Sequence, residues 1–263
     1  MRSDTTALGG RATLALLAIL WPAVGRARGQ VPSDSEAPRA ARLFGANELL
    51  ELRLTADFGA IAKERGTTKH DHPGVLSYVG PAGDTISLDV QLHTRGHFRL
   101  RACSYPPLKI DLPTERTAHT LFSHQKSLKL VVQCRSGQGY VNYLLEEYLI
   151  YRVYNLLTDL SFRARLARVT YVDPGKKDPP ETRYGFFVED DDRMAHRNHG
   201  QVFVQQGVVQ EETDFAQMGL VGVFEYLIGN TYWSVAALHN IVLVRDSVDS
   251  GNTIFPVPYD FDW

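Results

Sequence analysis

The first half of the chain contains short runs in which apolar and polar residues alternate. In residues 49–55, three leucines alternate with Glu51 and Arg53. This two-residue period is typical of a β-strand with one buried face. A turn rich in Gly, Pro and Asp separates two of the runs and predicts a hairpin. We predict a mainly antiparallel sheet with strands at residues 49–55, 75–79, 85–92, 108–112 and 127–133.

The period changes in the second half of the chain. Within residues 142–158, Leu145, Leu149, Val153 and Leu156 recur at helical spacing. This pattern predicts an amphipathic helix whose first residue, an asparagine, is its N-cap. Beyond it we predict strands at residues 167–172 and 184–189, a helix at 215–228, and a closing hairpin at 241–244 and 254–257.

Residues 1–29 have the composition of a cleavable secretory signal. Arg2 and Arg11 precede an apolar run at residues 12–21, and a proline and several small residues follow it. That run is shorter than the roughly 20 apolar residues that a membrane-spanning helix needs. A basic start, a short apolar core and small residues are the parts of a signal peptide. We therefore predict export with cleavage after Gly29, with Gly25 as the second choice of cleavage site; the alternative is an uncleaved membrane anchor.

The rest of the chain carries little that suggests a charged partner or a membrane. Residues 30–42 offer almost nothing to bury and are predicted to form a disordered leader. No later stretch is long and apolar enough for a transmembrane segment after signal cleavage. The chain has 28 basic and 30 acidic residues and a net charge of −2. Without a basic excess, we predict no nucleic-acid partner.

The two cysteines, Cys103 and Cys134, both lie in the exported part of the chain. An oxidising compartment allows such a pair to form a disulfide. A loop of this size would contribute about 3 to 4 kcal/mol to stability in the chain-entropy model. The alternative is two buried free thiols.

Several segments, taken in order, resemble a known family. They are an Arg-Gly turn at residues 94–98, a strand with a lysine at 106–110, and a helix followed by a strand at 144–173. A segment with two asparagines at 227–240 and one with two aspartates at 259–262 complete the set. The chain is similar in these segments to the CotH-type family of atypical protein-kinase-like proteins, which includes exported bacterial members.

The resemblance implies an α+β, two-lobed protein-kinase-like fold. Its N-terminal lobe, residues 43–189, would be a mainly antiparallel sheet with one long helix at residues 142–158. Residues 190–263 would begin a helical C-terminal lobe that holds the catalytic and metal segments. The chain stops at Trp263 directly after two acids, so we expect this lobe to be truncated and the chain to be a fragment.

The resemblance also implies roles for individual residues in phosphoryl transfer, which depends mainly on positioning and electrostatics. A lysine would contact the nucleotide phosphates and a helix carboxylate would position it. Lys109 and Glu147 match the family best, and Lys129 and Glu146 are the alternatives. Either chosen side chain could instead be solvated. The implied catalytic residues are Lys109, Glu147 and Asn230, and the implied nucleotide-binding residues are Lys109, Arg95 and Glu189. For Glu189, a solvated hinge is the alternative.

Asp260 and Asp262 are the strongest candidates for metal binding. They lie two residues apart at a predicted strand end, so strand geometry would place both carboxylates on one side. Aromatic residues bracket them, and oxygen donors in an apolar setting suit Mg²⁺ or Mn²⁺. The resemblance adds Asn240 as a neutral ligand. The alternative is a turn with two solvated acids.

One position departs from the family pattern. Tyr232 stands where the resemblance leads us to expect an acid, and a phenol with a pKa near 10 is a poor base at neutral pH. The resemblance implies an exported protein that binds ATP with Mg²⁺ or Mn²⁺ and transfers phosphate to a secreted or envelope protein. The alternative is a catalytically inactive kinase-like protein, or pseudokinase, with a binding or surface-structural role.

Overall fold

The computed structural model describes residues 43–66, 69–96, 98–248 and 251–262. The predicted signal peptide, residues 1–29, and the predicted leader, residues 30–42, lie outside the described residues, as does Trp263. Within the described part of the chain, no helix is both long enough and apolar enough to cross a membrane.

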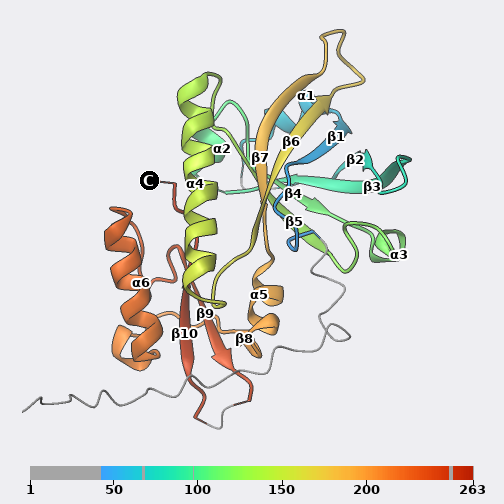
Figure 1. Cartoon of the computed structure of the whole chain (residues 1–263). Coiled ribbons are helices and arrows are strands. Elements are labelled where there is room, and N and C mark those ends of the chain that lie inside the picture. Colours follow the sequence, from blue (N-terminus) through green and yellow to red (C-terminus); the bar gives the residue numbers. More distant parts are fainter. Residues whose placement is uncertain (1–42, 67–68, 97, 249–250, 263) are drawn as a thin grey trace, which may run out of the picture. The chain divides into compact units, whose positions relative to one another are not determined.

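Seven strands form a closed barrel (Figure 1). Their order around it is β1-β2-β3-β4-β5-β7-β6, and the barrel closes where β6 pairs with β1 in parallel, with Val169 opposite Leu52. All other neighbouring pairs are antiparallel. The strands are β1 (Leu50–Ala56), β2 (His72–Val79), β3 (Thr85–Thr94), β4 (Leu108–Asp111), β5 (Ser127–Val132), β6 (Ala164–Val172) and β7 (Glu181–Val188).

The alternating pattern fills the barrel with side chains. Along β1 and β3, buried residues alternate with more exposed ones, because successive side chains of a strand point to opposite faces. Leu54, Leu92 and Leu130 are fully buried in the same apolar cluster. The strands expected from this pattern are confirmed, with ends that differ by a few residues.

The predicted two-lobed kinase-like fold is wrong. The expected antiparallel sheet lobe is a closed mixed barrel, because β6, which follows the long helix, pairs with the first strand of the sheet. The expected helical lobe is built largely around a second, three-stranded sheet of β8 (Gly200–Val202), β9 (Ile241–Asp246) and β10 (Ile254–Pro258). The helices beside it are α5 (Asp191–Arg197), α6 (Phe215–Leu227) and a 3₁₀ turn, η2 (Gln210–Glu212).

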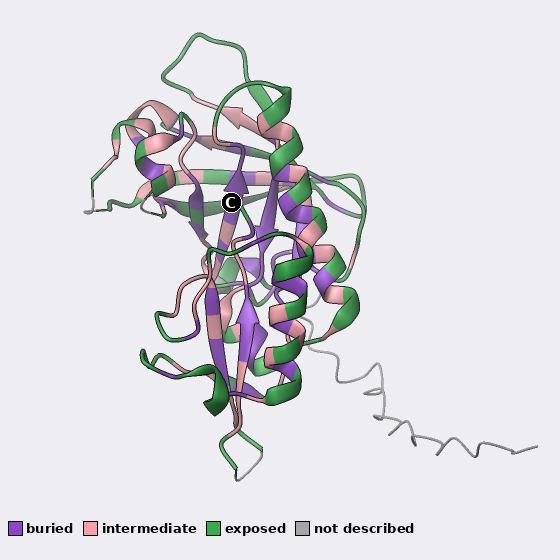
Figure 2. Cartoon of the chain, turned by 90° about the vertical axis from the view of Figure 1, so that its left-hand side faces the viewer, coloured by how far each residue is buried: buried purple, intermediate pink, exposed green. Residues whose placement is uncertain are grey.

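The long helix α4 (Gln138–Leu157) runs beside β6 and β7, with the second sheet near its last turns (Figure 1). It begins four residues before the predicted Asn142, directly after Gly137, whose φ of 111° suits glycine. The predicted buried stripe is also wrong, since Leu149 and Leu156 are exposed. The buried face instead carries Leu144, Glu147, Tyr148, Tyr151 and Tyr154. Figure 2 shows helices with one buried and one exposed side.

The tyrosine face of α4 is buried because it meets other aromatic rings. Tyr151 packs against Phe186 and Phe261, with ring centroids 5.7 and 4.8 Å apart, and Tyr154 packs against Phe224 at 4.6 Å. These rings belong to a second apolar cluster between α4, β7, α6 and the small sheet. Aromatic pairs of this kind add to the stability gained from burial alone.

The predicted disulfide between Cys103 and Cys134 is confirmed. It joins the residue after α2 (Phe98–Ala102) to the segment after β5, and both Ser104 and Tyr105 donate backbone hydrogen bonds to the carbonyl of Cys134. The described residues also form the short helices α1 (Phe58–Lys63) and α3 (Thr114–Thr117). The disulfide therefore fixes the short helix α2 against the barrel.

Candidate functional site

Three carboxylates from distant parts of the sequence converge on one point. Glu147 lies midway along α4, and Asp260 and Asp262 lie in the segment that follows β10. One carboxylate oxygen from each lies within 4.8 Å of the others. Glu147 is buried and Asp260 is half-buried; Asp262 is exposed as a whole residue, but its side chain is only 31% exposed. We call these three residues the acid cluster.

Phe261 anchors the segment that carries the two aspartates. Its side chain is buried and packs edge-on against Tyr151 of α4. The backbone N–H of Asp260 donates a hydrogen bond of 2.8 Å to the hydroxyl of the same tyrosine. Asp260 has a φ of 61°, in the left-handed region that few non-glycine residues adopt. Anchoring on both sides of this residue holds the strained backbone in place.

Arg99 of α2 lies among the three acids, and no sequence pattern had indicated this. Its Nε donates to Asp262 Oδ2 at 2.5 Å and its Nη2 to Glu147 Oε2 at 3.3 Å. Burial lowers the pKa of Arg99, but Glu147 and Asp262 outweigh this and raise it above its ordinary value. Because Arg95, Arg99 and Arg101 share one short segment, no local pattern distinguishes the arginine that reaches the cluster.

The cluster holds its acids in an environment that favours the protonated form. Burial raises the pKa of Glu147 to about 8. The positive charge of Arg99 offsets only part of this rise, and the negative charges of Asp262 and Asp260 add to the rise. Burial and the neighbouring Asp260 raise the pKa of Asp262 to about 6. Oε1 of Glu147 is buried and has no hydrogen-bond partner in the described chain. A cation could take the place of the proton that Glu147 holds at neutral pH.

Asn240, the predicted neutral metal ligand, lies beside the cluster. Its amide nitrogen donates to the carbonyls of Tyr232 and Asp260, at 3.1 and 3.3 Å. These bonds tie the loop after α6 to the aspartate segment. The second predicted asparagine, Asn230, is buried, and its side-chain oxygen accepts a 2.8 Å hydrogen bond from the backbone N–H of Tyr232. Both asparagines thus hold the loop that carries Tyr232.

Of the two candidate lysines, Lys129 lies nearer to this region. Lys109 points outward from β4, where its ammonium lies 3.4 Å from Asp111. Lys129 lies on β5 directly opposite Lys109, and its ammonium donates to Asp191 at 2.5 Å. The Lys129 ammonium also lies 5.7 Å from the ring centre of Tyr259, the residue before Asp260. The structure therefore does not bring Lys109 to the acid cluster.

The two remaining predicted nucleotide-binding residues differ in their surroundings. Glu189 is buried and accepts hydrogen bonds from Arg197 at 2.8 and 3.2 Å and from the backbone N–H of Arg163 at 3.2 Å. Both oxygens of the Glu189 carboxylate therefore already accept hydrogen bonds from the protein. The charge of Arg95 lowers the pKa of Glu147, so Arg95 acts electrostatically on the cluster. Its Nε is buried without a hydrogen-bond partner in the described chain.

Sequence reasoning also missed Glu225, near the end of α6. Its side chain is fully buried, and neither carboxylate oxygen has a hydrogen bond of ordinary geometry within the described residues. Burial raises the pKa of Glu225 to about 7, although the neighbouring Asn230 amide opposes part of the rise. An acid therefore lies beneath the Tyr232 loop, but the protein closes it off from solvent. An isolated glutamate in an apolar helix gives no signal of this in the sequence.

Comparisons with protein-family models, with curated proteins and with solved structures find no match for this chain.

Proposed function

We propose that the acid cluster binds a divalent cation, Mg²⁺ or Mn²⁺, and through it the phosphates of a nucleotide such as ATP. The convergence of three carboxylates within 4.8 Å carries the proposal. When ionised, they contribute three negative charges against the two positive charges of Arg99 and Arg95, which leaves a net negative site. Carboxylate oxygens are the ligands that both cations prefer in proteins.

Basic side chains beside the acids support the nucleotide part of the proposal. Arg95 and Arg99 act on the cluster electrostatically, and Lys129 lies against Tyr259. Cations next to a metal-binding group of acids suit a ligand whose phosphates carry several negative charges. The bound metal would neutralise charge on the phosphate oxygens. Together with the resemblance to the CotH-type family, this makes phosphate transfer to a secreted or envelope protein the proposed activity.

A second candidate is binding without turnover, and two observations favour it. Arg99 hydrogen-bonds Asp262 and Glu147 and so occupies part of the space between the acids. Tyr232, at the position of the expected acid, is 65% exposed with its ring packed edge-on against His239. Glu225 is buried beneath this loop, and the described residues 228–240 include no Asp or Glu that could be open to a substrate there. This candidate is a nucleotide- or metal-binding protein of the cell exterior.

Titration of the full chain with Mn²⁺, followed by electron paramagnetic resonance, tests the metal site. We expect Glu147→Gln to weaken Mn²⁺ binding by at least about tenfold, since it removes a charged ligand. Glu146→Gln is the matched control, because Glu146 is the exposed neighbour on the same helix. Arg99→Gln should strengthen binding, because it removes a competing cation. If neither the wild type nor Arg99→Gln binds Mn²⁺, the proposal is wrong.

A phosphate-transfer assay separates the two candidates. The full chain is incubated with Mn²⁺, γ-labelled ATP and the secreted proteins of the producing cells. Label in any protein, lost in Asp260→Asn, would support the transferase and exclude the non-catalytic candidate. Binding of Mn²⁺ and ATP without transfer would support the second candidate instead.

Export is part of the same proposal. The Cys103–Cys134 disulfide supports it, because such bonds persist mainly in oxidising compartments. N-terminal sequencing of the protein recovered outside the cytoplasm should begin at Gln30, directly after the predicted cleavage site. Recovery of the chain in the cytoplasm with its first 29 residues intact would contradict it.

A further inference from the structure

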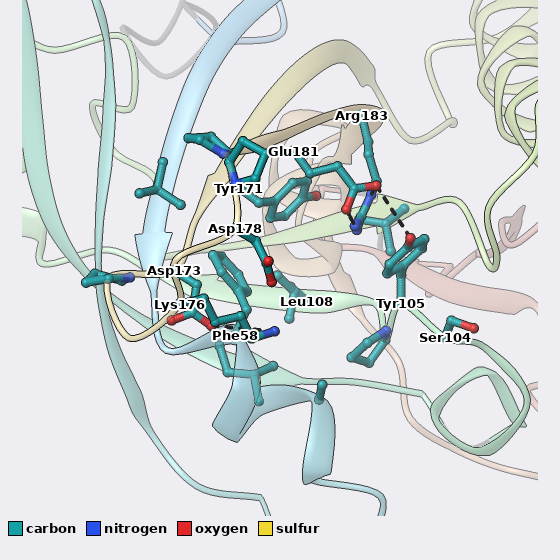
Figure 3. Close-up of a pocket in the computed structure, with 18 residues that line it drawn as sticks. Phe58, Ser104, Tyr105, Leu108, Tyr171, Asp173, Lys176, Asp178, Glu181 and Arg183 are labelled. Atoms are coloured by element: carbon teal, nitrogen blue, oxygen red, sulfur yellow. Dashed lines mark hydrogen bonds and ion pairs between the residues drawn. The ribbon is translucent and has the colours of Figure 1, made fainter.

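A separate cavity of about 460 Å³ lies at one end of the barrel, where β6 ends and β7 begins (Figure 3). Its wall includes α1, the start of β4, the end of β5 and the loop of residues 173–180. We call it the barrel-end pocket. It shares no residue with the acid cluster. Its volume lies in the range of roughly 300–1,000 Å³ that is typical of small-molecule sites, and barrel mouths are frequent places for them.

Aromatic rings contribute to the pocket wall. Phe58 and Tyr171 pack edge to face with their ring centres 5.2 Å apart, and Tyr105 and Leu108 also line the cavity. Three prolines, at positions 174, 179 and 180, lie along the loop that borders it. Because proline fixes its backbone φ, this loop has less freedom than its length suggests. The pocket is therefore largely preformed for an apolar or aromatic group.

Most charged groups of the pocket are already matched by protein partners. Asp173 accepts hydrogen bonds of 3.0 Å from the N–H groups of Gly59 and Gly175 and lies 3.9 Å from the ammonium of Lys176. Near the opposite wall, the guanidinium of Arg183 pairs with Glu181 and stacks 3.3 Å from the ring centre of Tyr105. The same Glu181 accepts a 3.4 Å hydrogen bond from the Tyr105 hydroxyl.

Asp178 and the hydroxyl of Tyr171 are among the polar groups of the pocket that have no protein partner within the described residues. Asp178 lines the cavity and has no ion pair or hydrogen bond within the described part of the chain. Figure 3 shows its side chain extending from the loop toward the middle of the labelled residues. The hydroxyl of Tyr171 is buried, also without a hydrogen bond to any described residue. An unmatched carboxylate beside aromatic faces favours a cation, since both attract positive charge.

We propose that the barrel-end pocket binds a small molecule with an aromatic or other apolar body and a protonated amine. The body lies against Phe58 and Tyr171, and the ammonium group pairs with Asp178. A neutral ligand of the same shape makes the apolar contact with Phe58 and Tyr171 but not the ion pair with Asp178. An anionic ligand of the same shape is repelled by the same carboxylate.

Binding of three matched probes to the full chain tests this assignment by isothermal titration calorimetry. The probes are phenethylamine, 2-phenylethanol and phenylacetate, which share a ring and differ in charge. We expect phenethylamine to bind at least about tenfold more tightly than the alcohol, because it alone forms a charge-assisted contact. Phenylacetate should bind most weakly. If it binds as tightly as the amine, or if none of the three binds, the proposal is wrong.

Two variants assign the contacts to residues. Asp178→Asn should reduce the affinity for phenethylamine to that for the alcohol, whereas Phe58→Ala should weaken both probes alike. Asp84→Asn is the matched control, because Asp84 is an exposed acid in the turn between β2 and β3, away from the pocket residues. Asp178 is itself exposed, so its variant should keep the wild-type melting temperature. An unchanged preference for the amine in Asp178→Asn would overturn the proposal.

Discussion

Glu225 makes the stability of this protein depend on pH in a defined window. Its carboxyl is fully buried, and burial raises its pKa from an ordinary 4.5 to about 7. Below pH 4.5 the folded and unfolded states both hold the proton, so the stabilisation is complete. Between pH 4.5 and 7 only the folded state holds it, so the free energy of unfolding falls by about 1.4 kcal/mol per pH unit. Above pH 7 both states are ionised and this loss stops.

The gap of roughly 2.5 pH units between the two pKa values corresponds to a total loss of about 3 kcal/mol. Glutamine has nearly the same shape as glutamate and cannot ionise. Urea unfolding of the full chain at pH 5 and pH 8 measures the effect in the wild type and in Glu225→Gln. Between these pH values, the wild type should lose about 2.5 kcal/mol more stability than the variant, because a small part of the total loss has already occurred at pH 5. A chelator in every sample keeps metal binding at the acid cluster out of the comparison.

The matched control for this experiment is Glu211→Gln. Glu211 is exposed in the 3₁₀ turn η2, so its variant should keep the wild-type loss between the two pH values. Glu147, whose pKa burial also raises, contributes a loss of the same sign to all three proteins and cancels in the comparison. Equal losses in the wild type and in Glu225→Gln would refute the reasoning.

Two further predictions concern the disulfide and the buried ion pair. Replacing both Cys103 and Cys134 with serine should cost about 3 to 4 kcal/mol in urea unfolding, because the bridge spans 31 positions of sequence. Arg197→Ala should cost about 3 to 5 kcal/mol, because it removes the ion-pair partner of the buried Glu189, which then keeps only the hydrogen bond from the backbone N–H of Arg163. Adding Glu189→Gln to this variant should restore part of the loss, and a cost below 1 kcal/mol for Arg197→Ala would contradict the structural role.

The residue pattern was enough to locate the strands but not to arrange them. Alternation in residues 49–55 predicts that one face of β1 is buried, and the buried leucines confirm it. The same alternation fits an open sheet and a closed barrel equally well. Closure depends on the parallel pairing of β1 with β6, which joins strands on opposite sides of the long helix in the sequence. Pairings of this kind leave no local signal.

The orientation of α4 was also decided by tertiary contacts. Helical spacing placed a helix there, but the same segment offers a leucine stripe and a tyrosine stripe. The leucine stripe is the more hydrophobic by composition, yet Leu149 and Leu156 are exposed, while Tyr151 and Tyr154 are buried. The aromatic side chains supplied by β7, α6 and the last segment favour the tyrosine face. Those partners are known only once the chain is folded.

The sequence by itself indicated where most of the strands and the two longest helices lie, that Cys103 and Cys134 could pair, and which acids of the cluster were candidates; it missed β8 and the short helices α2, α3 and α5. The tertiary structure decided that Glu147, Asp260 and Asp262 meet, that Arg99 lies among them, and that Lys109 does not. It also formed the barrel-end pocket from segments that no motif connects. The physical reason for this difference is that the two kinds of signal act over different separations along the sequence. Periodicity and cysteine count are read along the chain, whereas burial, charge pairing and cavity shape depend on residues brought together by folding.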